Sequence, residues 1–249
     1  MRKRKDKVAE EARKKEQTKQ ELKRKSATRE QILDIIIACE DEASAPTYFK
    51  MLFAQLQISR KITPDSFVIA EHTNTHPTGI LEDLVKHKCK FSGKSYKDFC
   101  HRWIVIDRDK ERVNGGGHSA EDFNNALAQA KRLKVNVAYS NDAFELWYLL
   151  HFNYLDSAIS RDDLLTKVIE KLQAQNASKF AELDKDTIKQ ADFTELIFEK
   201  LQTLQETAIK NAERLMSSYE AGHNPESDNP STTVHKLVAL LTSLWKEKR

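Results

Sequence analysis

Short, continuous runs of apolar residues recur along the middle of the chain. The runs at 35–39 and 103–106 are mostly β-branched or aromatic, which is typical of strands buried on both faces of a parallel sheet. Two further segments, at 67–70 and 135–139, are also rich in β-branched and aromatic residues, although Asn136 interrupts the second. The pattern therefore predicts four strands.

Between these runs, apolar residues are spaced by three and four positions, which predicts helices. The first helix begins near Pro46, the second near Thr78, and the third at Ser119, which with Asp122 forms a partial capping box. Strands that alternate with helical crossovers form a parallel sheet covered on both faces. We therefore expect an α/β fold of Rossmannoid type, with a parallel sheet of about four strands flanked by helices.

Acidic residues stand where two of the predicted strands end. Glu40, followed by Asp41 and Glu42, ends the first strand, whereas Asp107 and Asp109 follow the third. If these strands are neighbours, the switch point of the sheet lies between Glu40 and Asp107. Three carboxylates held together repel one another unless a cation lies among them, and such oxygen ligands suit Mg²⁺ or Mn²⁺. Glu40, Asp107 and Asp109 are therefore candidate catalytic residues and metal ligands, and Glu42 is a weaker candidate ligand.

The only glycine cluster of the sequence, at 115–117, comes shortly after Asp109. Its spacing matches neither the P-loop nor the dinucleotide-binding fingerprint. Because glycine runs mark mobile connections, we favour a flexible loop at the mouth of the site. A phosphate cradle is the alternative.

The segment 140–152 is apolar nearly all round, which predicts a helix buried between layers. Glu145 is its only interior acid, and Asn141 would lie one turn earlier on the same face. A buried carboxylate needs a partner, which would be a metal, an arginine or a backbone cap. Glu145 is therefore a further weak candidate metal ligand, and a structural ion pair is the equal alternative. His151 would lie away from this face, as a core or interface histidine.

Beyond residue 156 the pattern is helical, with predicted helices at 162–172, 193–219 and 232–245. We expect residues 31–155 to form the α/β domain and residues 156–249 to form a helical region packed on the same core.

The 249-residue chain has a mean hydropathy of −0.65 and no apolar run long enough to span a membrane. Its amino terminus is lysine-rich with no apolar segment behind it, unlike a secretion signal. Three cysteines without CxxC spacing indicate reduced thiols. These features predict a cytoplasmic protein.

The net charge of +3 conceals an asymmetry. Residues 1–30 contain thirteen lysines and arginines against six acids, about +7, which leaves about −4 for the remainder. A basic arm on an acidic body either contacts the backbone of nucleic acid or is a solvated, disordered or loosely helical tail. The candidate nucleic-acid-binding residues are Arg2, Lys3, Arg4, Lys5, Lys14, Lys15, Lys23, Arg24 and Lys25.

Several motifs together resemble the RloB family, over about residues 32–241. They are Cys39-Glu40, Pro46-x-Tyr48-Phe49, Asp107-Arg108-Asp109, Ser140-Asn141-x-x-Phe144-Glu145-Leu146-Trp147 with Leu149-Leu150-His151-Phe152, and Asn229-Pro230-Ser231-Thr232-x-Val234. The family is related to Toprim domains, the metal-dependent catalytic module of topoisomerases, primases and OLD-type nucleases. Its members occur in bacterial restriction-modification and abortive-infection loci, often beside an ABC-type or AAA-type ATPase.

The resemblance implies a Toprim-like fold in which Glu40 is the strand-end glutamate and Asp107 and Asp109 are the DxD pair. The family usually reads Glu-Gly-x-x-Thr-Glu-Pro after the first strand, whereas here Asp41 replaces the glycine and Ala45 the second glutamate. Either Asp41 or Glu42 substitutes as an acid, or metal binding is weakened.

Three functions are therefore compared. The first is a Mg²⁺- or Mn²⁺-dependent nuclease that acts on DNA or RNA in anti-phage defence, with an ATPase partner and scope for homo-oligomerisation. The second is a catalytically degenerate docking or sensing subunit of an ATPase-containing defence complex. The third is a phosphotransferase with Asp107 as its nucleophile, which we rank lower because its DxD motif would follow the first strand of the domain.

Overall fold

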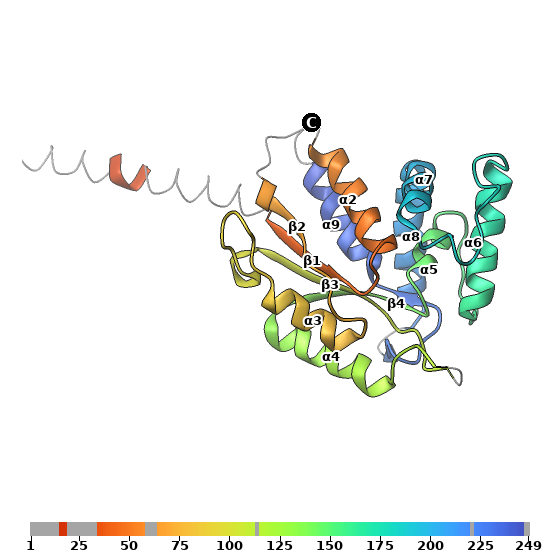
Figure 1. Cartoon of the computed structure of the whole chain (residues 1–249), viewed down its shortest axis with the longest axis horizontal. Coiled ribbons are helices and arrows are strands. Elements are labelled where there is room, and N and C mark those ends of the chain that lie inside the picture. The colour runs from red at the N-terminus through yellow and green to blue at the C-terminus, as the bar shows by residue number, and fades with distance from the viewer. Residues whose placement is uncertain (1–14, 19–33, 58–63, 113–114, 220–221, 247–249) are drawn as a thin grey trace, which may run out of the picture.

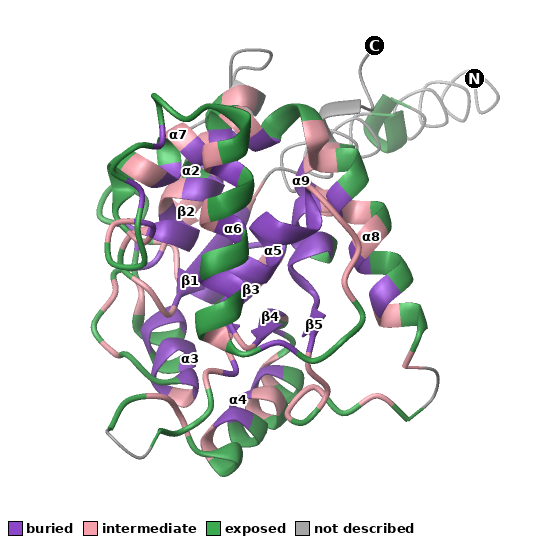
Figure 2. Ribbon diagram, turned by 90° about the vertical axis from the view of Figure 1, so that its right-hand side faces the viewer, coloured by how far each residue is buried: buried purple, intermediate pink, exposed green. Residues whose placement is uncertain are grey.

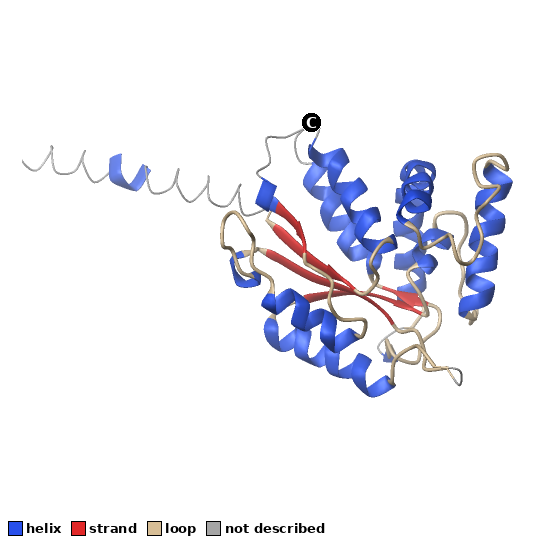
Figure 3. Cartoon of the chain, in the orientation of Figure 1, coloured by secondary structure: helices blue, strands red, loops and turns tan. Residues whose placement is uncertain are grey.

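The computed structural model describes residues 15–18, 34–57, 64–112, 115–219 and 222–246. Its centre is a five-stranded sheet in the order β2-β1-β3-β4-β5 (Figure 3). The strands are β1 (Ile35–Cys39), β2 (Phe67–Ile69), β3 (His101–Asp107), β4 (Asn136–Asn141) and β5 (Ser231–Thr232). The first four are parallel, and β5 pairs with β4 in the antiparallel sense. The predicted α/β fold is confirmed, and β5 is an addition that the sequence analysis did not predict.

Strand β1 lies between β2 and β3, so the chain passes from β1 to β2 on one side and then crosses to β3 on the other. Cys39 pairs with Val105 in the parallel ladder, which brings the last residues of β1 and β3 to the same edge. The expected switch point between the first and third strands is therefore confirmed.

Helices cover both faces of the sheet (Figure 1). On one face lie α3 (Pro77–Lys86) and α4 (Ala120–Leu133), and on the other lie α2 (Ser44–Gln57) and α9 (Val234–Lys246). Ile36 of β1 packs into the first layer, whereas its neighbours along the strand pack into the second. This division follows from the pleat, because successive side chains of a strand point to opposite faces.

The C-terminal helices share the larger hydrophobic cluster with α2 and the sheet, and that cluster forms the buried centre seen in Figure 2. They are α6 (Arg161–Gln175), α7 (Ala191–Leu201) and α8 (Gln205–Ser217), ahead of α9. The helix predicted at 193–219 is interrupted by a 3-10 turn, Gln202–Leu204. The chain bends there because α7 packs on α2, whereas α8 packs on α5 (Glu145–Leu150). The division into two domains at residue 155 stays a prediction.

The helix predicted at 140–152 is wrong at its start. Ser140 and Asn141 are the last residues of β4, and the helix itself, α5, has only six residues. The side-chain amide of Asn141 donates to the carbonyl oxygens of Pro225 and Glu226, each at 3.1 Å. Asn141 therefore does not share a helix face with Glu145, because β5 and its loop extend the sheet from far along the chain. His151 is buried, as expected of a core histidine.

Within the described part of the chain, every helix is too short or too polar to cross a bilayer.

Candidate acidic site at the sheet edge

A cavity of about 440 Å³ opens at the carboxyl edge of the sheet, at the switch point between β1 and β3. Its charged lining comes from both the sheet and the C-terminal region. The lining residues are Glu40, Asp41, Ala45, Thr75, His76, Val105, Asp107, Asp109, Gly116, Gly117, His118, Phe144, Arg161 and Lys189. The three main candidates from the sequence, Glu40, Asp107 and Asp109, therefore lie together.

Glu40 is held against β3 by two hydrogen bonds. Its backbone N–H donates to the carbonyl oxygen of Val105 at 3.0 Å, which continues the ladder one residue beyond β1. Its carboxylate oxygen Oε2 accepts from the backbone N–H of Asp107 at 2.9 Å. The parallel register thus fixes the orientation of the Glu40 carboxylate toward the end of β3.

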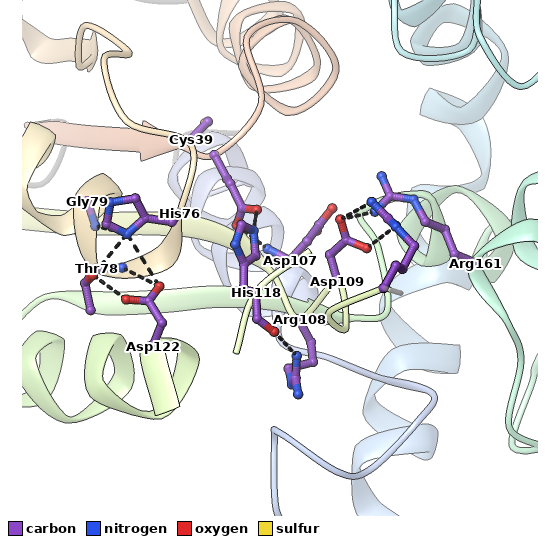
Figure 4. A network of polar contacts seen from close by, with 12 residues as sticks. Cys39, His76, Thr78, Gly79, Asp107, Arg108, Asp109, His118, Asp122 and Arg161 are labelled. Carbon is purple, nitrogen blue, oxygen red and sulfur yellow. Dashed lines mark hydrogen bonds and ion pairs between the residues drawn. The ribbon is translucent and has the colours of Figure 1, made fainter. Parts of the chain in front are cut away.

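His118 contacts the other oxygen of the same carboxylate, through Nε2 and Glu40 Oε1 (Figure 4). Burial lowers the pKa of His118, but the hydrogen bond and charge of Glu40 outweigh it and raise the pKa above its usual value. The backbone N–H of His118 donates to the carbonyl oxygen of Asp109 at 2.8 Å. The sequence analysis missed His118, although its position directly after the glycine cluster was an available signal.

The glycine cluster itself lies at the cavity, since Gly116 and Gly117 line it. Gly117 has a φ of +78°, and a Cβ there would come within 2.6 Å of the carbonyl oxygen of Asp109. Only glycine fits this close approach of two backbone segments. The expected position at the mouth of the site is confirmed.

Asp107 is the carboxylate with the fewest partners in the cavity. Burial raises its pKa well above the usual value, and the charge of Glu40 raises it further, whereas the charge of Lys189 opposes the shift. No side chain or backbone group of the described residues donates a hydrogen bond to its carboxylate oxygens. Two acidic groups in this arrangement favour a proton or a cation between them.

Asp109 is already paired with cations, as Figure 4 shows for Arg161. Its Oδ2 lies 2.6 Å from Nη1 of Arg161, the first residue of α6. Its Oδ1 lies 2.7 Å from Nη1 of Arg112. The charge of Asp109 is therefore balanced by two arginines.

Asp41 and Glu42, the acids that follow Glu40, serve different purposes. Asp41 lines the cavity, but its carboxylate accepts a hydrogen bond from the Ser44 hydroxyl. The backbone N–H of Ala45 donates to both oxygens of the same carboxylate, at 3.0 Å to Oδ1 and 3.1 Å to Oδ2. These bonds satisfy the first turn of α2, which explains why the helix begins at Ser44, before Pro46. The Glu42 side chain is 84% exposed and lies 3.9 Å from His72, outside this cavity.

Glu145, the first residue of α5, is completely buried. Neither of its carboxylate oxygens has a hydrogen-bond partner, and Nζ of Lys189 lies 4.0 Å from Oε1. This contact is the structural ion pair that was the alternative for Glu145, with a lysine from the C-terminal region as its cation, and the candidate role of Glu145 as a metal ligand stays a prediction. Lys189 also lines the cavity, so this ion pair links the core to the site.

The donors suit a hard divalent cation in part. Glu40 and Asp107 are adjacent carboxylates, and Asp107 is partly buried without a hydrogen-bond donor, which favours a positive charge beside it. Asp109 is engaged with arginines, and within the described residues no group of three or more Asp, Glu, His or Cys side chains is arranged to hold a metal ion.

The basic arm falls almost wholly outside the described residues. Of its nine candidate nucleic-acid-binding residues, only Lys15 is described, as an exposed residue of one helical turn at 15–18. The other eight lie outside the described part of the chain.

The fold and the cavity define a class of α/β proteins with an acidic cleft at the switch point of a parallel sheet. The chain belongs to the family described as RloB-like protein, whose profile matches residues 35–241. The match includes all the residues that line the cavity. Searches of curated proteins and of solved structures found no match.

Proposed function

We propose that the protein is a Toprim-like nuclease that hydrolyses phosphodiester bonds of DNA or RNA with Mg²⁺ or Mn²⁺. The observation that supports the proposal is that Glu40 and Asp107 present adjacent carboxylates at the switch point, and that the partly buried Asp107 carboxylate has no hydrogen-bond donor among the described residues. In open α/β sheets, this edge is where ligands bind.

Asp107 and Glu40 would hold the cation. Asp109 would become a further ligand when its ion pairs with Arg112 and Arg161 are broken. When bound, the cation supplies charge stabilisation at the scissile phosphate. The protein contributes two cationic side chains, Arg161 and Lys189, which line the cavity together with the acids and suit the negative charge of a phosphate. His118 keeps the Glu40 carboxylate in place.

The biological setting is proposed from the family resemblance. The protein would act in the bacterial cytoplasm, in abortive infection or another anti-phage defence, with an ABC-type or AAA-type ATPase as its partner. The basic arm at 1–30 would hold the nucleic acid backbone without reading sequence. Homo-oligomerisation belongs to the same proposal.

A second candidate function is a degenerate subunit that docks or senses without cleaving. The pairing of Asp109 with Arg112 and Arg161 favours it, because it removes one of the three expected ligands. Ala45, which lines the cavity where the family usually has a glutamate, favours it as well.

The deciding experiment compares plasmid DNA and tRNA cleavage by the wild type and by Asp107→Asn, with Mg²⁺, Mn²⁺ or EDTA, alone and with a neighbouring ATPase. We expect cleavage that requires the metal and is abolished in Asp107→Asn, with an unchanged circular dichroism spectrum. Ser178→Ala, an exposed change outside the cavity, is the matched control. Equal cleavage by Asp107→Asn would refute the site. Silence under all conditions, with no metal binding by calorimetry, would favour the docking subunit.

A further inference from the structure

The turn between α3 and β3 carries an exposed aromatic ring among lysines. Phe91 is 92% exposed, far more than Val85 at 37%, which is the other exposed large hydrophobic residue among those described. Residues 86–97 contain five lysines and no acid. An exposed aromatic side chain flanked by cations is the combination that binds unpaired bases and their phosphates.

The turn is a defined structure. Lys88 and Ser95 form an antiparallel bridge, and the N–H of Cys89 donates to the carbonyl oxygen of Lys94 at 2.9 Å. The N–H of Gly93, which has a φ of +69°, donates to the carbonyl oxygen of Cys89 at 2.9 Å and closes the turn. Phe91 is therefore held away from the core by a hydrogen-bonded frame, and its exposure is built into the fold.

The lysines of the turn differ in their partners. Lys86, Lys90 and Lys94 pair with Glu82, Glu71 and Asp34, at 2.7, 3.0 and 2.9 Å. Lys88 and Lys97 are exposed and have no acidic partner among the described residues. The ion pair between Lys90 and Glu71 is highly exposed, so Lys90 can readily exchange Glu71 for another anion. At least three exposed lysines, Lys88, Lys90 and Lys97, therefore lie within six residues of Phe91 in sequence and are available to phosphates.

The turn also contacts Asp34, the residue before β1. The carboxylate of Asp34 accepts from Nζ of Lys94, and the backbone carbonyl oxygen of Asp34 accepts from the N–H of His101. Figure 1 shows this turn beside the amino end of β1. Residues 1–30, which precede Asp34 in the sequence, carry about +7, and both this charge and the lysines of the turn favour a polyanion.

We propose that the Phe91 turn, defined as residues 88–93 with Lys97, binds a single-stranded segment of nucleic acid, with Phe91 stacked on a base and Lys88 and Lys97 on phosphates. It is separate from the cavity: α3 runs from His76 at the cavity to Lys86 at the turn, and its ten residues span about 15 Å. The proposed role of the turn is binding alone, and this role does not depend on cleavage at Glu40 and Asp107.

The test measures binding of the full chain to a fluorescein-labelled single-stranded oligonucleotide, as DNA and as RNA, by anisotropy in EDTA. We expect Phe91→Ala to weaken binding about fivefold or more, and Phe91→Trp to preserve it, because a base stacks equally well on indole. Lys88→Ala/Lys97→Ala should weaken binding. The slope of log affinity against log salt concentration should also become shallower, by the amount expected for the loss of about two phosphate contacts. The matched control, Lys171→Ala/Lys210→Ala, removes the same charge from exposed positions on α6 and α8 and should change binding less.

Two results would overturn the proposal. One is a Phe91→Ala variant that binds both oligonucleotides as tightly as the wild type. The other is a loss of binding to phosphatidylserine vesicles in Phe91→Ala without any loss toward the oligonucleotides, which would assign the turn to a membrane surface. Because Phe91 is exposed, the substitution leaves the core intact, and an unchanged melting temperature verifies this.

Discussion

The carboxylate of Glu40 accepts a hydrogen bond from the backbone N–H of Asp107, so the acid at the end of β1 is anchored to the end of β3. The contact joins residues 67 positions apart in sequence and places two carboxylates at the switch point of the sheet. The same carboxylate also contacts His118, which follows the glycine loop. The position of Glu40 therefore depends on both the register of the sheet and the path of that loop.

Replacement of Gly117 by alanine should damage the site. A Cβ at Gly117 would press on the carbonyl oxygens of Asp109 and Lys110, and its φ of +78° strains any other residue. We expect the free energy of unfolding to fall by about 2 kcal/mol or more and any metal-dependent activity to drop. Gly115→Ala is the control, because its φ of +88° is similar but its Cβ would meet nothing within 4 Å. Urea unfolding of the two variants checks the prediction, which fails if they lose equal stability.

Arg112 should compete with a divalent cation for Asp109. Its side chain is 49% exposed and its Nη1 lies 2.7 Å from Asp109 Oδ1, so Arg112→Ala should cost at most about 0.5 kcal/mol of stability. Mn²⁺ affinity, measured by calorimetry, should rise because one positive charge that neutralises Asp109 is removed. Lys131→Ala, on the exposed side of α4, is the control for the charge change. Equal Mn²⁺ affinity in the two variants would contradict the competition.

Arg108, between the two aspartates of the DxD, should act in stability rather than in binding. Its guanidinium is nearly buried and pairs with Glu226 at 2.6 Å, and it also donates to the carbonyl oxygen of His118 at 3.0 Å. Glu226→Ala should cost about 3 kcal/mol, because it leaves a buried cation without its anion. Arg108→Met/Glu226→Leu should cost less than Glu226→Ala alone.

The comparison for Arg108 uses urea unfolding of the three proteins, with Glu82→Ala as a reference for an exposed ion pair, which should lose under about 1 kcal/mol. A Glu226→Ala variant no less stable than Glu82→Ala would show that the buried pair is unimportant.

Stability should fall in mild acid because of His151. Burial lowers the pKa of His151 to about 4, from 6.5 in an unfolded chain. Between these values the unfolded state binds a proton that the folded state does not, so the free energy of unfolding decreases as the pH falls from 6.5 toward 4. At about 1.4 kcal/mol per pKa unit, the loss reaches about 3 kcal/mol.

Urea unfolding between pH 7 and 4, for the wild type and His151→Gln, checks the prediction for His151. The variant should show a shallower pH dependence in this window. A residual slope is expected from His235, whose pKa burial also lowers to about 4. Identical slopes in the wild type and His151→Gln would contradict the assignment.

Four of the five strands, the fold class and the acids at the strand ends could be predicted from the sequence. These are local properties, because a short apolar run rich in β-branched residues, such as Ile35–Cys39, favours a strand buried on both faces, and Glu40 directly follows it. The order of strands and helical connections then limited the topology, so that the meeting of Glu40 and Asp107 could be predicted.

Only the tertiary structure decided which charges meet in the cavity and which elements complete the sheet. Arg161 and Lys189 belong to the helical C-terminal region and line the cavity. Neither has a local sequence pattern that distinguishes it from the other lysines and arginines. The local sequence predicts a helix at Ser140 and Asn141, whereas in the structure both residues end β4 and pair with β5. Pairings between distant segments depend on the packing of the whole chain, and a periodicity of a few residues carries no information about them.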